Sequence, residues 1–147
     1  MDTMMENLWD NHLAVRGSPE DVARFKKQAA GFFPWNEPDF KPRAEILNFH
    51  SLVPVPLTVR AAGYDPAGFE WEYLHWGCNG AWDSHTLDED DDLVVYRFDT
   101  AWSPPLAFVE QVSKDWPGLE FELEFEEPAR GFKGQATCQR GNWQTSV

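Results

Sequence analysis

The feature that most limits the possible folds is a strict alternation of apolar and acidic residues over residues 119–126 (LEFELEFE). Successive side chains of a β-strand point to opposite faces, so the leucines and phenylalanines face one way and the glutamates the other. A slip of one residue would bury the glutamates, which firmly specifies the register. We therefore expect a sheet with one face on a core and a row of carboxylates on the other.

The residues around this strand predict a helix packed on a sheet. Leu93–Phe98 is rich in β-forming residues, and apolar residues alternate with polar ones again over residues 132–139, after a turn at 127–131. Between the first two strands, Ser103 is suited to cap a helix and Pro104 to occupy its first position. The segment therefore reads strand, helix, strand, turn, strand.

The N-terminal half adds the remaining elements of a compact fold. Asn11–Arg16 is predicted as a strand, Ser18–Ala30 as a capped helix, and Ile46–Leu52 as a second strand. A Trp-rich insertion over about residues 57–92 follows. The resulting order, with its extra C-terminal strand, is the split β-α-β plan of ferredoxin-like folds. We expect an α+β domain over residues 1–147, with two main helices on one face of an antiparallel sheet.

The charge of the chain is concentrated in one segment. The formal net charge is −13, and residues 65–127 hold 17 acids against only two bases, Arg97 and Lys114. Such a field repels nucleic acids and membrane surfaces and attracts basic partners. Two cysteines, no apolar run of membrane-spanning length and no secretory signal favour the cytoplasm of a host cell, and no cofactor is predicted.

Short motifs occur along nearly the whole chain in the order found in one known family. They are residues 11–17 (NHLAVRG), 49–56 (FHSLVPVP), 75–78 (HWGC), 81–83 (AWD), 98–105 (FDTAWSPP) and 132–134 (FKG). In these motifs the chain resembles the YubB ferredoxin-like domain proteins carried by phages and plasmids. The resemblance implies a ferredoxin-like topology without an iron–sulfur cluster and an origin on a mobile element. It assigns no catalytic residues.

A second acidic stretch, residues 88–92 (DEDDD), lies directly before the strand that begins at Leu93. The predicted partner-binding residues are Glu120, Glu122, Glu124 and Glu126 together with Asp88, Glu89, Asp90, Asp91 and Asp92. Carboxylates two apart on a strand are separated by roughly 6.5–7 Å, about half the charge density of one DNA strand. A DNA-like surface and a solvated face that prevents association of sheet edges both fit this pattern.

Other constellations point less clearly to a site. An EF-hand loop starting at Asp88 would require Gly and Glu where the chain has Leu93 and Asp99, so we expect a solvated loop without calcium. His75 and Cys78, with His85 and Asp83 nearby, have the residue types of a zinc site, but a second cysteine pair is missing, and we predict no metal.

The tryptophans of the insertion have two possible roles. Trp71, Trp76, Trp82 and Trp102 are able to stack on bases, but base-stacking proteins combine their aromatic residues with a basic groove. In a segment this acidic, the tryptophans are expected to pack the insertion onto the sheet.

These observations favour a small non-enzymatic protein that binds a basic host protein through its acidic face. A nucleic-acid-binding partner would make it an inhibitor of the anti-restriction or anti-CRISPR type. One alternative is a small enzyme that uses His50, His75, His85 or Cys78. Another is a structural or assembly module, and the sequence leaves the oligomeric state open.

Overall fold

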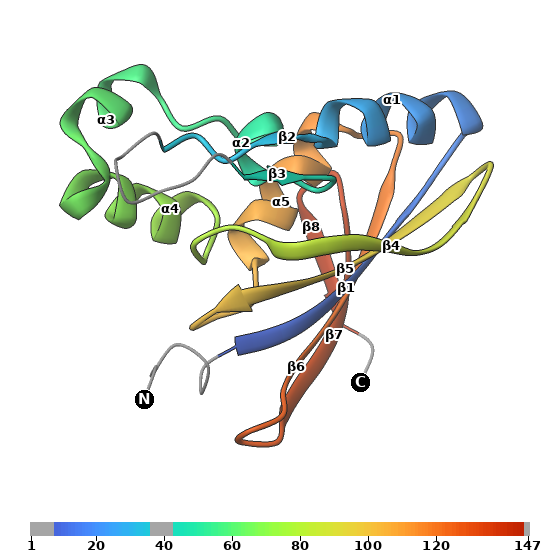
Figure 1. Ribbon diagram of the computed structural model, residues 1–147. Coiled ribbons are helices and arrows are strands. Elements are labelled where there is room, and N and C mark those ends of the chain that lie inside the picture. The colour runs from blue at the N-terminus through green and yellow to red at the C-terminus, as the bar shows by residue number, and fades with distance from the viewer. Residues whose placement is uncertain (1–7, 36–42, 146–147) are drawn as a thin grey trace.

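The computed structural model of the protein describes residues 8–35 and 43–145 (Figure 1). Its main sheet has six strands in the order β4-β5-β1-β6-β7-β8, and every neighbouring pair is antiparallel. The strands are β1 (Leu8–Arg16), β4 (Trp82–Asp90), β5 (Leu93–Ala101), β6 (Glu120–Glu127), β7 (Phe132–Gln139) and β8 (Asn142–Thr145). A separate small ladder pairs β2 (Gly31–Phe32) with β3 (Ala44–Glu45).

The helices gather on one side of the main sheet, as Figure 1 shows. They are α1 (Pro19–Ala29), α2 (Phe49–Leu52), α3 (Leu57–Ala62), the single turn η2 (Tyr64–Gly68), α4 (Phe69–His75) and α5 (Leu106–Asp115). No helix in the described residues is both long and apolar enough to span a membrane.

The order of elements is that of a ferredoxin-like domain. The chain runs β1-α1-β4-β5-α5-β6, and these four strands lie side by side as β4-β5-β1-β6, so the predicted α+β class is confirmed. Strands β7 and β8 extend the sheet beyond β6. The face opposite the helices is therefore wider than a four-stranded ferredoxin-like core would offer.

The core lies between the helices and the inner face of the sheet. On β6, Phe121 and Leu123 are fully buried, as the alternating pattern predicts. The Phe25 ring of α1 meets the Phe121 ring edge-on at 5.6 Å between centroids. On the opposite side of the core, the Phe49 and Phe108 rings stack at 3.6 Å. Two aromatic contacts thus tie α1 and α2 to the same core.

The predicted second strand at Ile46–Leu52 is wrong. Residues 49–52 form the short helix α2, because one helical turn buries both Phe49 and Leu52 against the core. The second strand of the ferredoxin-like core is β4 instead, which the prediction had counted within the insertion of 57–92. The inserted part lies between α1 and β4, and we call its described residues, 30–35 and 43–81, the helical segment.

The start of α5 also differs from its prediction. Ser18 caps α1 as expected, accepting a hydrogen bond from the Asp21 amide at 3.2 Å. Helix α5 begins only at Leu106, and the Ser103 hydroxyl donates to the carbonyl oxygen of Gly77 in the helical segment. Ser103 therefore ties the helical segment to the sheet rather than capping a helix.

Candidate interaction surface on the open face

The face of the sheet that points away from the helices carries most of the predicted binding residues. We call the outward side chains of β1, β5 and β6 the open face. They are Asp10, His12, Ala14, Arg16, Leu93, Val95, Arg97, Asp99, Glu120, Glu122, Glu124 and Glu126. The predicted glutamate row thus stands together on this face, as its register requires. Glu124 and Glu126 are exposed, and Glu120 and Glu122 are partly exposed.

The glutamate row continues into a charged network on the neighbouring strands. Arg97 of β5 lies 3.0 Å from the Asp10 carboxylate of β1 and 3.2 Å from that of Asp99. His12 lies between Asp10 at 3.7 Å and Glu124 at 4.0 Å. These contacts join three strands, so the face is an array of carboxylates with one arginine near its centre.

The carboxylates of this network stand in different environments. Partial burial raises the pKa of Asp99 above its ordinary value; Arg97 opposes this shift, and the like charges of Asp10 and Asp83 add to it. Glu124 has about half of its side-chain surface exposed. The array is consequently most solvated along β6, where a partner's cations have the easiest access.

The open face is hollowed near the β6–β7 hairpin. A depression of about 420 Å3 lies there, lined by Asp10, His12, Glu124, Phe125, Glu126, Lys133, Gly134 and Gln135. Lys133 is the strand partner of Glu126 and is the only lysine in the lining. Three carboxylates against one lysine give the depression a net negative charge, which suits the head group of a partner's basic side chain.

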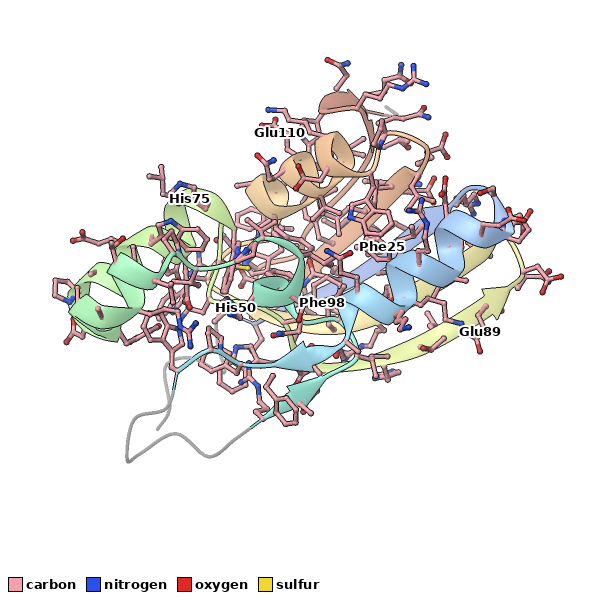
Figure 2. All side chains as sticks on the ribbon, turned by 90° about the horizontal axis from the view of Figure 1, so that it is seen from above. Phe25, His50, His75, Glu89, Phe98 and Glu110 are labelled. Atoms are coloured by element: carbon pink, nitrogen blue, oxygen red, sulfur yellow. The ribbon has the colours of Figure 1, made fainter. Side chains whose placement is uncertain are left out.

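The second predicted acidic stretch is separate from the glutamate row. Residues 88–90 belong to the edge strand β4, and β5 and β1 lie between it and β6, a distance of roughly 14 Å at ordinary strand spacing. Asp88 pairs with Val95, whose side chain is outward, whereas Glu89 binds Lys26 of α1 at 2.6 Å. Figure 2 shows Glu89 at the margin of the molecule beside α1. The stretch is a strand and a tight turn rather than the solvated loop we predicted.

Three residues of the enzyme alternative, His50, His75 and Cys78, lie in the helical segment, whereas the exposed His85 is the strand partner of Arg97 on β4. His50 and His75 lie in the helical segment (Figure 2), where the His50 Nδ1 accepts a hydrogen bond from the Val55 amide at 3.0 Å. Burial lowers the pKa of His50, and the nearby charge of Arg60 adds to this effect. Cys78 is fully buried, and burial raises the pKa of its thiol to about 12, which disfavours the reactive thiolate.

The other potential ligands do not converge on a metal site. His75 is exposed and stacks on Trp71 at 4.4 Å between ring centroids, while His85 lies on β4 opposite Arg97. Within residues 8–35 and 43–145, no group of three or more His, Cys, Asp or Glu side chains is arranged to hold a metal ion.

The tryptophans chiefly pack the helical segment and its margin. Trp76 is buried and its indole nitrogen donates to the Val53 carbonyl oxygen at 3.0 Å. Trp71 meets Trp76 edge-on at 5.6 Å, and Trp82 is covered by the guanidinium of Arg43 at 3.6 Å. Trp102 is 46% exposed and is the exception.

Four residues of the charged network were not among the predicted binding residues: Asp10, His12, Arg97 and Asp99. The alternation of Leu8–Arg16 and Leu93–Ala101 places these side chains outward on their own strands. Their convergence depends on β5 pairing with β1 and β1 with β6. These are contacts between residues more than 75 positions apart, and local sequence patterns do not specify such pairings.

Comparisons with known proteins agree with this architecture. Residues 81–147 match the family described as the ferredoxin-like domain in Api92-like protein, in agreement with the ferredoxin-like order to which β4, β5, α5 and β6 belong. Curated proteins give no match.

Among solved structures, the chain is similar to the protein api92 from Yersinia pseudotuberculosis. The TM-score is 0.55 at 14% sequence identity, over 67% of this chain and 39% of that one. The chain thus spans well under half the length of api92, and at this identity the likeness concerns the fold alone. The ferredoxin-like part of the expected resemblance is confirmed, and membership of the YubB family remains a prediction.

Proposed function

We propose that this protein binds a basic partner protein through its open face and acts without catalysis. The observation that carries the proposal is the register of β6, which sets Glu120, Glu122, Glu124 and Glu126 outward on the side of the sheet away from the helices. Like charges so close together reduce the stability of the sheet, and a cationic partner would relieve their repulsion.

The network around the row supports the same proposal. Arg97 compensates Asp10 and Asp99, and Arg16 is the strand partner of Glu120. The exposed Glu124 and Glu126 have His12 and Lys133 beside them. An interface of this kind gains specificity and association rate from charge complementarity, and its affinity falls as salt rises. The depression beside Glu124 and Glu126 is the position at which we place a lysine or arginine of the partner.

The finer form of the proposal concerns the partner. A host protein that binds nucleic acid presents a basic channel, and carboxylates roughly 6.5–7 Å apart along β6 would occupy it as a partial substitute for phosphates. The protein would then be a cytoplasmic inhibitor, encoded by a phage or plasmid, of a host defence system of the restriction or CRISPR kind. Arg97 adds a positive charge at the centre of the face, where DNA would have none. The face would therefore substitute for phosphates only along β6.

The first test compares two variants with equal changes of charge. One carries E120K, E122K, E124K and E126K, and the control carries E20K, D65K, E70K and D115K at exposed acids of the helix side. Each is immobilised beside the native protein, exposed to bacterial lysate and washed with increasing salt. We expect the native protein and the control to retain the same partner and the open-face variant to lose it. Equal retention by both variants would refute the proposal.

The DNA-like form is tested by competition. If the captured partner binds DNA, a short duplex should displace it from the native protein, and the native protein should displace the duplex in return. A partner that holds both at once would contradict the inhibitor mechanism while leaving binding through the open face intact. A third variant that reverses Asp88, Glu89, Asp90, Asp91 and Asp92 determines whether the β4 stretch contributes to the contact.

A further inference from the structure

The helical segment contains a carboxyl group in an unusual position. Glu72 of α4 is fully buried, with no exposed surface. Its Oε2 accepts a hydrogen bond from the Trp35 indole nitrogen at 2.8 Å, and its Oε1 has no hydrogen-bond partner among the described residues. Buried carboxylates normally accept several hydrogen bonds or pair with a cation, so this site is poorly suited to a charge.

The nearest cation is engaged elsewhere. The Arg43 guanidinium lies between the rings of Phe33 and Trp82, at 4.4 and 3.6 Å from their centroids. It donates to the Ala81 carbonyl oxygen at 3.2 Å and lies 3.4 Å from the Glu45 carboxylate. Arg43 therefore attracts Glu72 electrostatically without bonding to it.

The remaining charged and titratable neighbours come from the elements packed around α4. Burial raises the pKa of Glu72 to about 8, against the opposing effects of the Trp35 hydrogen bond and of Arg43. Tyr64 of η2, Tyr73 of α4 and Cys78 after α4 have raised pKa values, each with burial as the main cause and the charge of Glu72 contributing. Tyrosine and cysteine side chains are either neutral or negatively charged, so none of these three groups supplies a positive charge that would stabilise the ionised carboxylate.

We propose that Glu72 is a proton-dependent latch that holds the helical segment closed when protonated and loosens it when ionised. The contact it secures joins α4 to Trp35, whose ring lies against Gly68, where an added Cβ would approach within 2.4 Å. Ionisation places a charge in a site where the described residues supply a single hydrogen-bond donor, so the free energy of the carboxylate falls when it reaches water. That movement separates α4 from Trp35.

The latch adjoins the margin of the sheet. Trp35 precedes residues 36–42 in the chain and Arg43 follows them. The guanidinium of Arg43 covers the ring of Trp82 on β4, and Trp82 is the strand partner of Asp99. Arg43, which attracts Glu72 electrostatically, therefore lies between the latch and the edge of the sheet. The inference stands whether or not the open face binds a partner.

The latch is tested by hydrogen exchange of the α4 amides. We compare the native protein with Glu72→Gln, which keeps an acceptor for Trp35 but takes no charge, and with Glu70→Gln at an exposed position of the same helix. Protection of α4 in the native protein, divided by that in Glu72→Gln at the same pH, should fall about tenfold per pH unit between pH 5 and 8 and then level off. A ratio that does not change with pH would overturn the latch.

A second measurement follows the titration of Glu72 directly. Carbon NMR of glutamate labelled at its carboxyl carbon reports the titration of Glu72 in the native protein, with Glu70→Gln used to exclude its helix neighbour from the assignment. A midpoint far above the ordinary range for glutamate, accompanied by a shift of the Trp35 indole N–H resonance over the same pH interval, supports the latch. An ordinary midpoint, or a raised midpoint without a shift of that resonance, refutes it.

Discussion

The same alternation of aromatic and acidic residues has opposite results in two regions of the molecule. In β6, residues 120–126 alternate along a strand, and every second residue is a glutamate that faces outward. In α4, residues 69–73 (FEWEY) alternate along a helix. Each helical residue turns about 100°, so side chains two apart point to nearly opposite sides. Glu70 is accordingly exposed, while Glu72 is buried.

An alternating pattern therefore predicts where the charges lie only when it is known whether the segment is a strand or a helix. The strand gathers Glu120, Glu122, Glu124 and Glu126 on one solvated face, where they are close to one another and to cations, and only Glu127 at its end is buried among the strand's glutamates. The helix separates two carboxylates and forces one of them into the core. We expect substitutions in the two regions to behave in correspondingly different ways.

The largest effect is expected inside β6 itself. Phe121→Ala removes a fully buried ring that packs on Phe25 and should lower the free energy of unfolding by about 3–5 kcal/mol. Its outward neighbour Glu122→Ala should change it by less than about 0.5 kcal/mol. Urea denaturation of both variants measures the two unfolding free energies. Similar losses would contradict a buried inner face and a solvated outer face on β6.

The next effect concerns the buried carboxyl of α4. The pKa of Glu72 is raised in the folded protein, to about 8 from an ordinary 4.5. Below pH 4.5, Glu72 is protonated in both the folded and the unfolded protein. Between pH 4.5 and 8 only the folded protein keeps this proton, so raising the pH favours unfolding. Above pH 8, the stability that the protonated Glu72 contributes is lost completely. The advantage of Glu72→Gln should grow by about 1.4 kcal/mol per pH unit within that interval.

Thermal or chemical denaturation at a series of pH values measures this advantage. Glu70→Gln supplies the exposed control on the same helix and should track the native protein throughout. If the difference in unfolding free energy between Glu72→Gln and the native protein did not change with pH, Glu72 would ionise with the same ease in the folded and the unfolded protein, as expected of the solvated acids of β6.

A smaller effect is expected at the centre of the open face. Arg97→Gln leaves Asp10 and Asp99 without their shared cation and should reduce stability by about 1 kcal/mol, since the pair is only partly shielded from water. Adding Asp99→Asn should recover part of the loss. Because salt screens the exposed part of this interaction, the deficit should shrink at high ionic strength, and a deficit insensitive to salt would point to packing instead.

The smallest effect is expected at the solvated end of the row. Glu126→Gln weakens the cross-strand pair with Lys133 and should cost about 0.5 kcal/mol or less at low salt. Lys133→Gln is the matched change on β7, and the double variant should lose no more than the larger single loss. A loss comparable to that of Phe121→Ala would show that the open face is structural rather than free for a partner.

Part of this architecture is predictable from the sequence because it depends on local physics. Ser18 before an acidic first turn marks the start of α1, and the strict alternation of residues 119–126 sets both faces of β6. The hairpin to β7 and the pairing of Lys133 with Glu126 follow from the turn at 127–131. These elements are controlled by neighbours in the chain.

The misassigned elements depend on distant partners. Residues 46–52 have strand-like composition, but the contact of Phe49 with Phe108 favours a helical turn. Strand β4 contains acids that disfavour strands in isolation, and pairing with β5 outweighs their propensity. The charged network of Asp10, His12, Arg97 and Asp99 likewise exists only once β1 lies between β5 and β6.

The position of β4 at the end of the sheet has a consequence for how the folded molecules behave in concentrated solution. An outermost strand exposes unpaired amide and carbonyl groups to which another chain can add. Asp88, Glu89 and Asp90 are exposed on that strand, so two copies approaching edge to edge meet with mutual repulsion. In strongly acidic solution, where carboxylates are neutral, this repulsion disappears, and growth of a continuous sheet from molecule to molecule becomes the expected route of precipitation.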